Sequence, residues 1–330
     1  MIEVSFPGKL FLMGEYAVME TGIKSVVSSV DARLFVNVSG SDDYSVQSRF
    51  GSVKGSDVFS MDSMKEVSAA INVTKEFIQR DLKHFNLVIQ SELDDGETKY
   101  GFGSSGVVIV GVLSALLKHE GIELTQLELF KLSVMVQYRL NSFSSGGDLA
   151  AAIYDDVLIY ARYDLNWLKG SKLKLNEIIK VDWPYLQIES LTLPYSICIG
   201  WTGTSNKTEN YTDAVNRAKD NDPMTYRAFL VNAARFVDQF IEAQDEDEFS
   251  HAVRGYRRLM VELGSWAKIN IETDDLRNLI DSAESLNISA KISGSGGGDC
   301  GIAFISDANR NKLDALNSLW ENYSIKMIQK

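Results

Sequence analysis

The stretch Gly101-Phe102-Gly103-Ser104-Ser105-Gly106 leads directly into an almost wholly apolar run over residues 107–117, which predicts a helix buried on most sides. Glycines let backbone N–H groups come close to an anion, and the start of the following helix adds partial positive charge. The hydroxyls of Ser104 and Ser105 can bond to phosphate oxygens, and one of them can ligate Mg²⁺. This first glycine loop (residues 101–106) favours a bound phosphate, and a plain serine N-cap with glycine neighbours is the alternative.

The same loop fits the spacing Gly-x-Gly-x-x-Gly, but its surroundings are not those of a dinucleotide-binding fold. Such a fold needs an apolar strand just before the loop and an acidic residue near a strand end about 20 residues later. Here the residue types of 93–99 predict a polar turn, and the pattern still predicts a helix at that later position. The Gly-Lys-Ser/Thr sequence of a P-loop is also absent from this segment. A phosphate loop of another kind remains.

A second glycine loop, Ser293-Gly294-Ser295-Gly296-Gly297-Gly298-Asp299, lies between two apolar strand patterns. Its glycines exceed the one or two that a hairpin needs. The surplus predicts that something passes close to the backbone, with an ordinary turn as the alternative. Two such loops in one chain indicate a bound polyphosphate.

Two shorter segments add charged candidates. Pro7-Gly8-Lys9-Leu10 ends an alternating strand pattern over residues 2–6, and Ser144-Ser145-Gly146-Gly147-Asp148 opens a predicted helix over residues 146–153. Taken alone, a solvated surface lysine explains Lys9, and an N-cap explains Asp148. The alternative is a pair of charged groups placed beside phosphate and metal.

The bulk properties exclude several classes of protein. A length of 330 residues predicts about two domains, and a net charge of −12 argues against non-specific binding to nucleic acid or anionic membranes. Cys198 and Cys300 lie in apolar runs and are expected to be reduced core thiols, while the three histidines lack metal-ligand spacing. The N-terminus has no signal-peptide pattern, and no apolar run reaches about 18 residues. We therefore expect a cytoplasmic protein, either a monomer or a homodimer.

Strand and helix patterns mix without strict alternation, so the predicted class is α+β. Residues 182–194 contain two of the four prolines and predict a domain boundary, giving domains over residues 1–190 and 191–330. Residues 34–38 predict a strand with residues 44–48 as its hairpin partner. Other expected elements are helices over 64–82, 124–140 and 308–320, three or four helices between 208 and 286, and strands over 85–89, 157–161, 196–201, 288–292, 301–305 and 324–328.

Together, and in this order along the chain, the four segments resemble the GHMP small-molecule kinases. The resemblance implies an N-terminal α+β domain and a C-terminal ferredoxin-like domain, with ATP and substrate in the cleft between them. Three segments, Lys99–Gly106, Gly200–Gly203 and Gly296–Ala303, are most similar to the branch whose acceptor is itself a phosphate ester. The resemblance thus implies a kinase that uses ATP and Mg²⁺ on a phosphorylated small molecule.

Roles for single residues follow from the same resemblance. Lys9 matches a lysine near the transferred phosphoryl group, Asp148 an aspartate proposed as base in alcohol-phosphorylating members, and Ser105 a serine that ligates Mg²⁺. Relatives supply a second metal ligand, a glutamate, from the helix before the aspartate, where this chain has Gln137. The residues expected around ATP are Lys99, Gly101, Gly103, Ser104, Ser105, Gly106, Gly294, Gly296 and Gly297. Those expected around the acceptor are Tyr16, Ser144, Ser145, Gly147, Trp201, Lys207, Lys291 and Ser293, with the two lysines as candidates to hold its phosphate.

The acceptor decides what Asp148 does. A phosphate monoester has a second pKa near 6, so its oxygens are mostly deprotonated at neutral pH and a base has little to remove. In that case we expect Asp148 to orient Lys9, Mg²⁺ or a substrate hydroxyl. Three alternatives remain open: a sister kinase acting on an alcohol, a decarboxylase of the same family, and a metabolite-binding regulator without catalysis. A regulator tends to lose the loop serines or the aspartate, and this chain keeps them.

Overall fold

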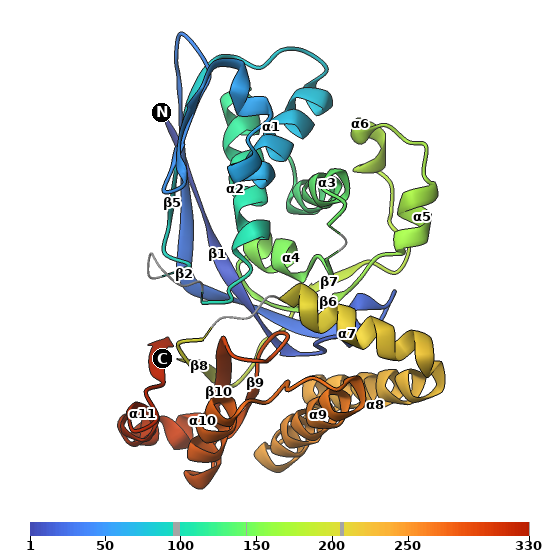
Figure 1. Ribbon diagram of the computed structural model, residues 1–330, viewed down its shortest axis with the longest axis vertical. Coiled ribbons are helices and arrows are strands. Elements are labelled where there is room, and N and C mark those ends of the chain that lie inside the picture. Colours follow the sequence, from blue (N-terminus) through green and yellow to red (C-terminus); the bar gives the residue numbers. More distant parts are fainter. Residues whose placement is uncertain (95–99, 143, 205–207, 330) are drawn as a thin grey trace.

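The structure is a computed structural model that describes residues 1–94, 100–142, 144–204 and 208–329. It contains two sheets, each covered by helices, stacked along the long axis of the molecule (Figure 1). The predicted α+β class is confirmed. No helix in the described ranges combines the length and the apolar character that crossing a membrane requires.

The first sheet follows the order β4-β3-β5-β2-β6-β7, with β1 pairing along β2. All its pairs are antiparallel except β3 with β5. The expected hairpin between residues 34–38 and 44–48 is wrong, because β1 and β5 both pair with that part of β2 and so occupy both of its edges. The strands are β1 (Ile2–Met13), β2 (Lys24–Gly40), β3 (Ser45–Ser48), β4 (Gly51–Lys54), β5 (Phe85–Ser91), β6 (Val157–Ala161) and β7 (Gln187–Ser190).

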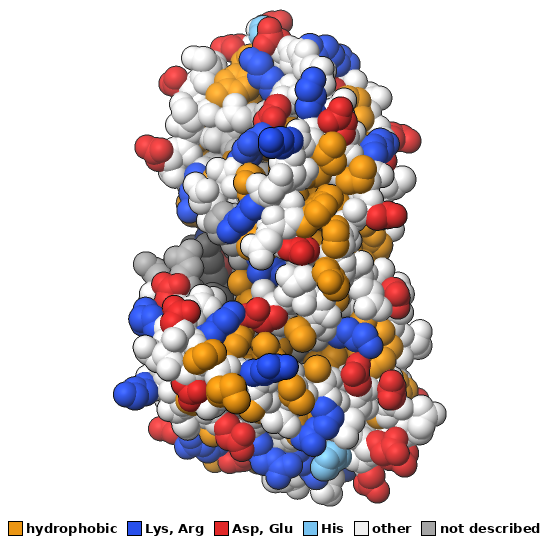
Figure 2. Space-filling model, turned by 90° about the vertical axis from the view of Figure 1, so that its right-hand side faces the viewer, with side chains coloured by type: hydrophobic (Ala, Val, Ile, Leu, Met, Phe, Trp, Pro, Cys, Tyr) orange, Lys and Arg blue, Asp and Glu red, His pale blue; other side chains and the backbone are white. Residues whose placement is uncertain are grey.

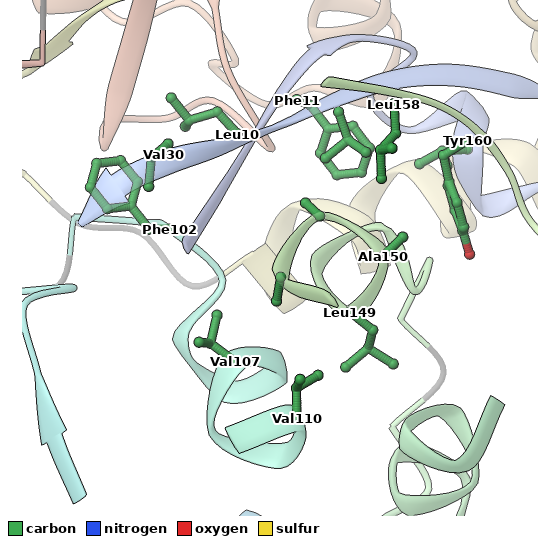
Figure 3. Close-up of a cluster of buried hydrophobic side chains, with 14 of the residues drawn as sticks. Leu10, Phe11, Val30, Phe102, Val107, Val110, Leu149, Ala150, Leu158 and Tyr160 are labelled. Atoms are coloured by element: carbon green, nitrogen blue, oxygen red, sulfur yellow. The ribbon is translucent and has the colours of Figure 1, made fainter. Parts of the chain in front are cut away.

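Helices α1 (Lys65–Ile78), α2 (Ser104–His119), α3 (Gln126–Arg139) and α4 (Gly147–Tyr154) gather on one side of this sheet (Figure 1). Helix α2 lies directly on β1 and β2, and it is apolar on nearly all sides because α1, α3 and α4 surround the rest of it. Figure 3 shows Val107 and Val110 of α2 in one buried cluster with Leu149 of α4 and Phe11 of β1. This packing fixes the starts of α2 and α4 relative to β1.

The second sheet follows the antiparallel order β11-β8-β10-β9. Its elements follow the order β-α-β-β-α-β, with the four helices α7 to α10 in the first helical position and α11 in the second, which is the ferredoxin-like arrangement that the resemblance implies. The elements are β8 (Ser196–Trp201), α7 (Thr208–Asn221), α8 (Pro223–Glu242), α9 (Glu246–Ala267), α10 (Asp274–Ser285), β9 (Ser289–Ile292), β10 (Cys300–Ile305), α11 (Leu313–Glu321) and β11 (Lys326–Gln329), while the short α5 (Leu165–Gly170) and α6 (Leu175–Ile178) precede β7.

The chain passes from the first sheet to the second between Ser190 and Ser196. Helix α8 nevertheless packs on β2 of the first sheet, and Lys24 forms an ion pair with Asp238 across this contact at 3.1 Å. The division into domains over residues 1–190 and 191–330 therefore stays a prediction. On the face drawn in Figure 2, acidic and basic side chains are interspersed and do not form a continuous basic surface.

The expected break of the first strand at Pro7-Gly8 is wrong, since β1 continues through it with a shift in register between Pro7 and Lys9. Pro7 cannot donate a ladder hydrogen bond, which is tolerated at such an irregularity. Gly8 is required there because a β-carbon would lie 2.8 Å from Cβ of Phe102. The Lys9 N–H then donates to the carbonyl of Phe102 at 3.0 Å. The irregularity thus joins β1 to the first glycine loop and brings Lys9 to it.

Candidate active site

Lys9, the first glycine loop and Asp148 come together at the starts of α2 and α4. A β-carbon on Gly103 would lie 3.2 Å from Cβ of Asp148 and 3.2 Å from Cε of Lys9. Both charged side chains therefore contact the same glycine, from different elements. The structure brings together three candidates that are separated by as many as 139 positions in the chain, from Lys9 to Asp148.

The carboxylate of Asp148 lies against α2 and is held from α3. Its Oδ2 accepts a hydrogen bond from Nε2 of Gln137 at 3.4 Å, and Oε1 of Gln137 accepts one from Oγ of Ser144 at 2.9 Å. Within the described residues, the buried Oδ1 of Asp148 has no hydrogen-bond partner. Gln137 thus contributes an amide that supports Asp148, at the position where relatives are expected to have a metal-binding glutamate.

For both Lys9 and Asp148, burial and the neighbouring charges shift the pKa in opposite directions. Burial lowers the pKa of Lys9 below its usual value, while the nearby carboxylates of Asp148, Glu15 and Asp299 act in the opposite direction. Burial likewise raises the pKa of Asp148, against the charge of Lys9. The Lys9 ammonium lies 4.6 Å from the ring centroid of Phe11, which gives it a further favourable contact. Each group therefore helps the other to stay charged in a poorly solvated place.

Helices α2 and α4 differ in their N-caps from α3. Helix α3 begins with a capping box of Thr125 and Glu128, whereas the N-caps of α2 and α4 are Gly103 and Gly146, with φ of 71° and 84° and no side-chain cap. A left-handed conformation of this kind suits glycine. The N–H groups at the start of α2 thus have no side-chain cap and can bind an anion, whereas in α4 the N–H of Gly147 donates to Oγ of Ser145. The N-cap interpretation of Asp148 is wrong, because Asp148 is the second residue of α4.

The second glycine loop (residues 293–299) is attached to β1 and to the segment after it. The Tyr16 hydroxyl donates to the carbonyl of Ser295 at 2.6 Å, and Oγ of Ser293 donates to the carbonyl of Phe11 at 2.9 Å. Part of the glycine surplus has a structural cause, since a β-carbon on Gly296 would lie 2.3 Å from the Ile271 carbonyl oxygen. A β-carbon on Gly294, by contrast, would meet nothing within 4 Å. Gly294 therefore has open space beside it.

The two glycine loops also meet each other. A β-carbon on Gly101 would lie 2.9 Å from Cγ of Asp299, so the Asp299 carboxylate packs on the first loop. Next to it, Sγ of Cys300 donates to the carbonyl of Tyr100 at 3.2 Å, and the Tyr100 ring meets Trp201 edge-on with 5.1 Å between centroids. Cys198 and Cys300 are both buried and neither forms a disulfide bond, as expected for reduced core thiols.

Several residues expected around the acceptor have other partners. Lys291 is fully buried and forms an ion pair with Glu15 at 2.5 Å. The expectation that Lys291 contacts the acceptor phosphate is therefore wrong. The Ser145 hydroxyl is buried and accepts a hydrogen bond from the N–H of Gly147 at 3.2 Å, which stabilises the turn before α4. Lys99 and Lys207 lie outside the described residues.

A hollow of about 640 Å³, which no sequence pattern indicated, opens beside Ser104 and Ser105. It lies between α1, α2 and strands β3 and β5, so its lining comes from five separate stretches of chain. Only the Ser104-Ser105 end could have been found from a motif. Apolar and aromatic side chains in the lining include Phe50, Met64, Val67, Val88, Ile89 and Val108.

No group of three or more potential metal-ligating His, Cys, Asp or Glu side chains occurs in the part of the chain that the structure describes. Mg²⁺ does not require one, since it is commonly held by one or two protein oxygens together with phosphates and water. The exposed Ser105 at the start of α2 and the unpartnered Oδ1 of Asp148 supply oxygens of that kind. This donor set fits Mg²⁺ bound together with a nucleotide.

Comparisons with known proteins agree with this arrangement. The family model for the GHMP kinases N terminal domain matches residues 65–156, and that for the GHMP kinases C terminal matches residues 239–322. The chain belongs to the GHMP kinases and is an ATP-dependent kinase. Its two-domain fold is the fold of this family.

Among curated proteins, the chain is 27% identical to a phosphomevalonate kinase of Streptomyces sp. (strain CL190), covering 97% of this chain and 94% of that protein. It is 24% identical to a mevalonate kinase of Thermococcus onnurineus (strain NA1), covering 94% and 91%. Among solved structures, the Lin0012 protein from Listeria innocua matches with a TM-score of 0.92 at 31% identity, covering 99% and 96%. Streptococcus pneumoniae phosphomevalonate kinase in complex with phosphomevalonate and AMPPNP matches with a TM-score of 0.88 at 26% identity, covering 99% and 98%.

Proposed function

We propose that this kinase transfers the γ-phosphoryl group of ATP to the phosphate of 5-phosphomevalonate, giving 5-diphosphomevalonate and ADP. An oxygen of the acceptor phosphate attacks the γ-phosphorus, and the bond from that phosphorus to the β–γ bridging oxygen breaks. The observation that carries the proposal is the likeness, over nearly the full length of both chains, to phosphomevalonate kinases in sequence and in structure. The site geometry supports it, because the first loop and Lys9 meet where two phosphates would have to approach each other.

The nucleotide has a place that fits its parts. The N–H groups of the first glycine loop and of the first turn of α2 would hold the triphosphate. The hollow beside Ser104 and Ser105 would take the adenine, since its walls are largely apolar and its volume suits a small aromatic ring. Magnesium would be held by Ser105 and Asp148 and would neutralise phosphate charge.

Charge neutralisation is the main task of this site, because phosphoryl transfer depends on positioning and electrostatics more than on covalent chemistry. Two like unit charges about 4 Å apart repel by about 4 kcal/mol at an effective dielectric constant near 20. Lys9 places a positive charge at this point, and burial makes that charge more effective while lowering the pKa of Lys9. Asp148 then orients Lys9 and helps to keep it protonated.

A mevalonate kinase is the second candidate, and curated mevalonate kinases are 22–26% identical to this chain, most of them over 94–96% of its length. An alcohol acceptor must lose a proton during transfer, which a phosphate acceptor need not do. The burial that raises the pKa of Asp148 would suit it to accept that proton. The two candidates therefore assign different roles to the same carboxylate.

One experiment distinguishes them. ADP release is measured with phosphomevalonate and with mevalonate as acceptor, and the product is identified by ³¹P NMR. A diphosphate shows two phosphorus resonances split by each other, whereas a phosphate ester shows a single unsplit one. Turnover of phosphomevalonate to a diphosphate supports the proposal. Turnover of mevalonate alone, or of neither acceptor, refutes it.

A further inference from the structure

Glu15 and Lys291 form an ion pair that is closed off from solvent. Nζ of Lys291 lies 2.5 Å from Oε1 of Glu15, and the two side chains are 0% and 1% exposed. Lys291 also donates to the carbonyl of Ile292 at 2.5 Å, and the hydroxyl of Tyr256 donates to the carbonyl of Glu15 at 2.8 Å. The pair is therefore fixed from both sides.

The pair connects two segments that must be aligned with each other for the proposed reaction. Glu15 follows Lys9 by six positions, just beyond the end of β1, while Lys291 lies on β9 two positions before the second glycine loop. Two further bonds connect the same segments, from Tyr16 to Ser295 and from Ser293 to Phe11. These contacts join β1 and the segment directly after it to β9 and the second glycine loop.

Stability alone is a poor explanation for such a pair. Removing two charges from water costs free energy that their attraction barely returns, and apolar side chains of similar volume often stabilise such a place at least as well. Of the two Glu15 oxygens, Oε2 is buried without a hydrogen-bond partner among the described residues, so the desolvation is incompletely compensated. What an ion pair adds over an apolar contact is one defined alignment of the two segments.

We propose that Glu15 and Lys291 are positioning residues that hold the second glycine loop in register with the segment carrying Lys9. The proposal rests on the proposed function, in which Lys9 acts on the transferred phosphoryl group. Neither side chain touches a substrate in this scheme, since both are buried. Their effect on catalysis passes through the loop and through Lys9.

The test uses the full-length chain with both charges removed together, Glu15→Gln with Lys291→Met, because removing only one would leave an unpaired buried charge. The matched control removes the exposed ion pair between the two halves, Lys24→Met with Asp238→Asn, which is expected to matter little. For each protein we measure the melting temperature, kcat and KM for ATP, and hydrogen exchange of the amides in residues 293–299.

The expected result for the Glu15/Lys291 variant is a folded protein whose loop amides exchange about ten-fold faster or more. Its kcat should fall about ten-fold or more while KM for ATP stays within about two-fold, because the first glycine loop is untouched. The Lys24/Asp238 control should keep wild-type exchange and kcat. A folded Glu15/Lys291 variant with wild-type exchange and wild-type kcat overturns the proposal, as does an equal loss of kcat in the control.

A second variant decides the matter if the double substitution prevents folding. Tyr16→Phe with Ser293→Ala removes two hydrogen bonds between the same segments without leaving a buried charge. The proposal predicts faster loop exchange and lower kcat here too, and unchanged values contradict it. Hydrogen exchange needs no acceptor, so a wild-type protein inactive on phosphomevalonate refutes the proposed function while this readout still tests the ion pair.

Discussion

Gly106 and Asp148 are so close that a β-carbon on Gly106 would lie 2.2 Å from Oδ2 of Asp148. The first residues of α2 and the second residue of α4 therefore share one small space, and the absence of a side chain at Gly106 leaves room for the carboxylate. This contact links the phosphate loop to the charged pair more tightly than the spacing of the motifs in the sequence indicates.

The first prediction concerns Gly106→Ala. Gly106 has an ordinary helical backbone, and alanine stabilises a helix relative to glycine by up to about 1 kcal/mol. A loss of function in this variant would therefore not result from a weaker helix α2. We expect kcat to fall about ten-fold or more, because the new methyl group displaces the Asp148 carboxylate. The control is Gly111→Ala on the same helix, whose methyl group meets Val36 and Leu34 of β2. That variant should lower the melting temperature and keep kcat, and a wild-type kcat in Gly106→Ala would contradict the prediction.

The second prediction concerns Lys9→Met, which keeps the length of the side chain and removes its charge. We expect a loss of transition-state stabilisation of about 3 kcal/mol, or about a hundred-fold in kcat/KM, comparable to removing a preorganised charge partner. Steady-state kinetics with the identified acceptor provides the measurement. Lys118→Met, at an exposed position near the end of α2, is the control and should remain fully active. Comparable activity in the two variants would exclude the role of Lys9.

The third prediction is a pH dependence. Burial lowers the pKa of Lys9 from its ordinary value, and Asp148 is the strongest influence in the opposite direction. Removing that negative charge with Asp148→Asn lowers the pKa of Lys9 further, so the protonated, active form is lost at a lower pH. The alkaline limb of the kcat profile should therefore move to lower pH, together with a fall in kcat. With a phosphate acceptor no base-type limb disappears, and the loss of such a limb would instead indicate an alcohol acceptor.

The fourth prediction tests the adenine hollow with Val108→Trp. Val108 lies one turn beyond Ser104 and Ser105 and contributes to the wall of the hollow, so an indole there would fill space that the base needs. KM for ATP should rise about ten-fold or more while KM for the acceptor stays unchanged. Val231→Trp, at a largely exposed position of α8, serves as the control for adding a large ring. Unchanged ATP affinity in Val108→Trp would place the adenine elsewhere.

The sequence was most informative where one short segment carries both a conformation and a chemistry. The first glycine loop could be recognised because its glycines and serines are adjacent, and the apolar run after it predicted a buried helix that the structure confirms as α2. Helix α3 and strand β5 were found within a few residues for the same reason, since periodicity is a local property.

The rest depends on contacts between segments that lie far apart in the chain. Lys291 looked like a cation available to a phosphate, and only the fold reveals that Glu15 neutralises it inside the protein. The strand at residues 45–48 has no local signal that would direct it to β5 and not to β2. Part of the glycine surplus in the second loop serves the close approach of Ile271, a residue more than twenty positions away. Patterns in the sequence do not reveal which surfaces will meet.

The edge-on contact between Tyr100 and Trp201 has a practical consequence. Tyr100 directly precedes the first glycine loop, and Trp201, one of five tryptophans in the chain, ends β8 in the other half of the molecule. Trp201 is 9% exposed, so we expect its emission to respond to its protein neighbours more than to bulk water. We therefore expect nucleotide binding at the first glycine loop to change the emission of Trp201, and a Trp201→Phe protein supplies the background to subtract.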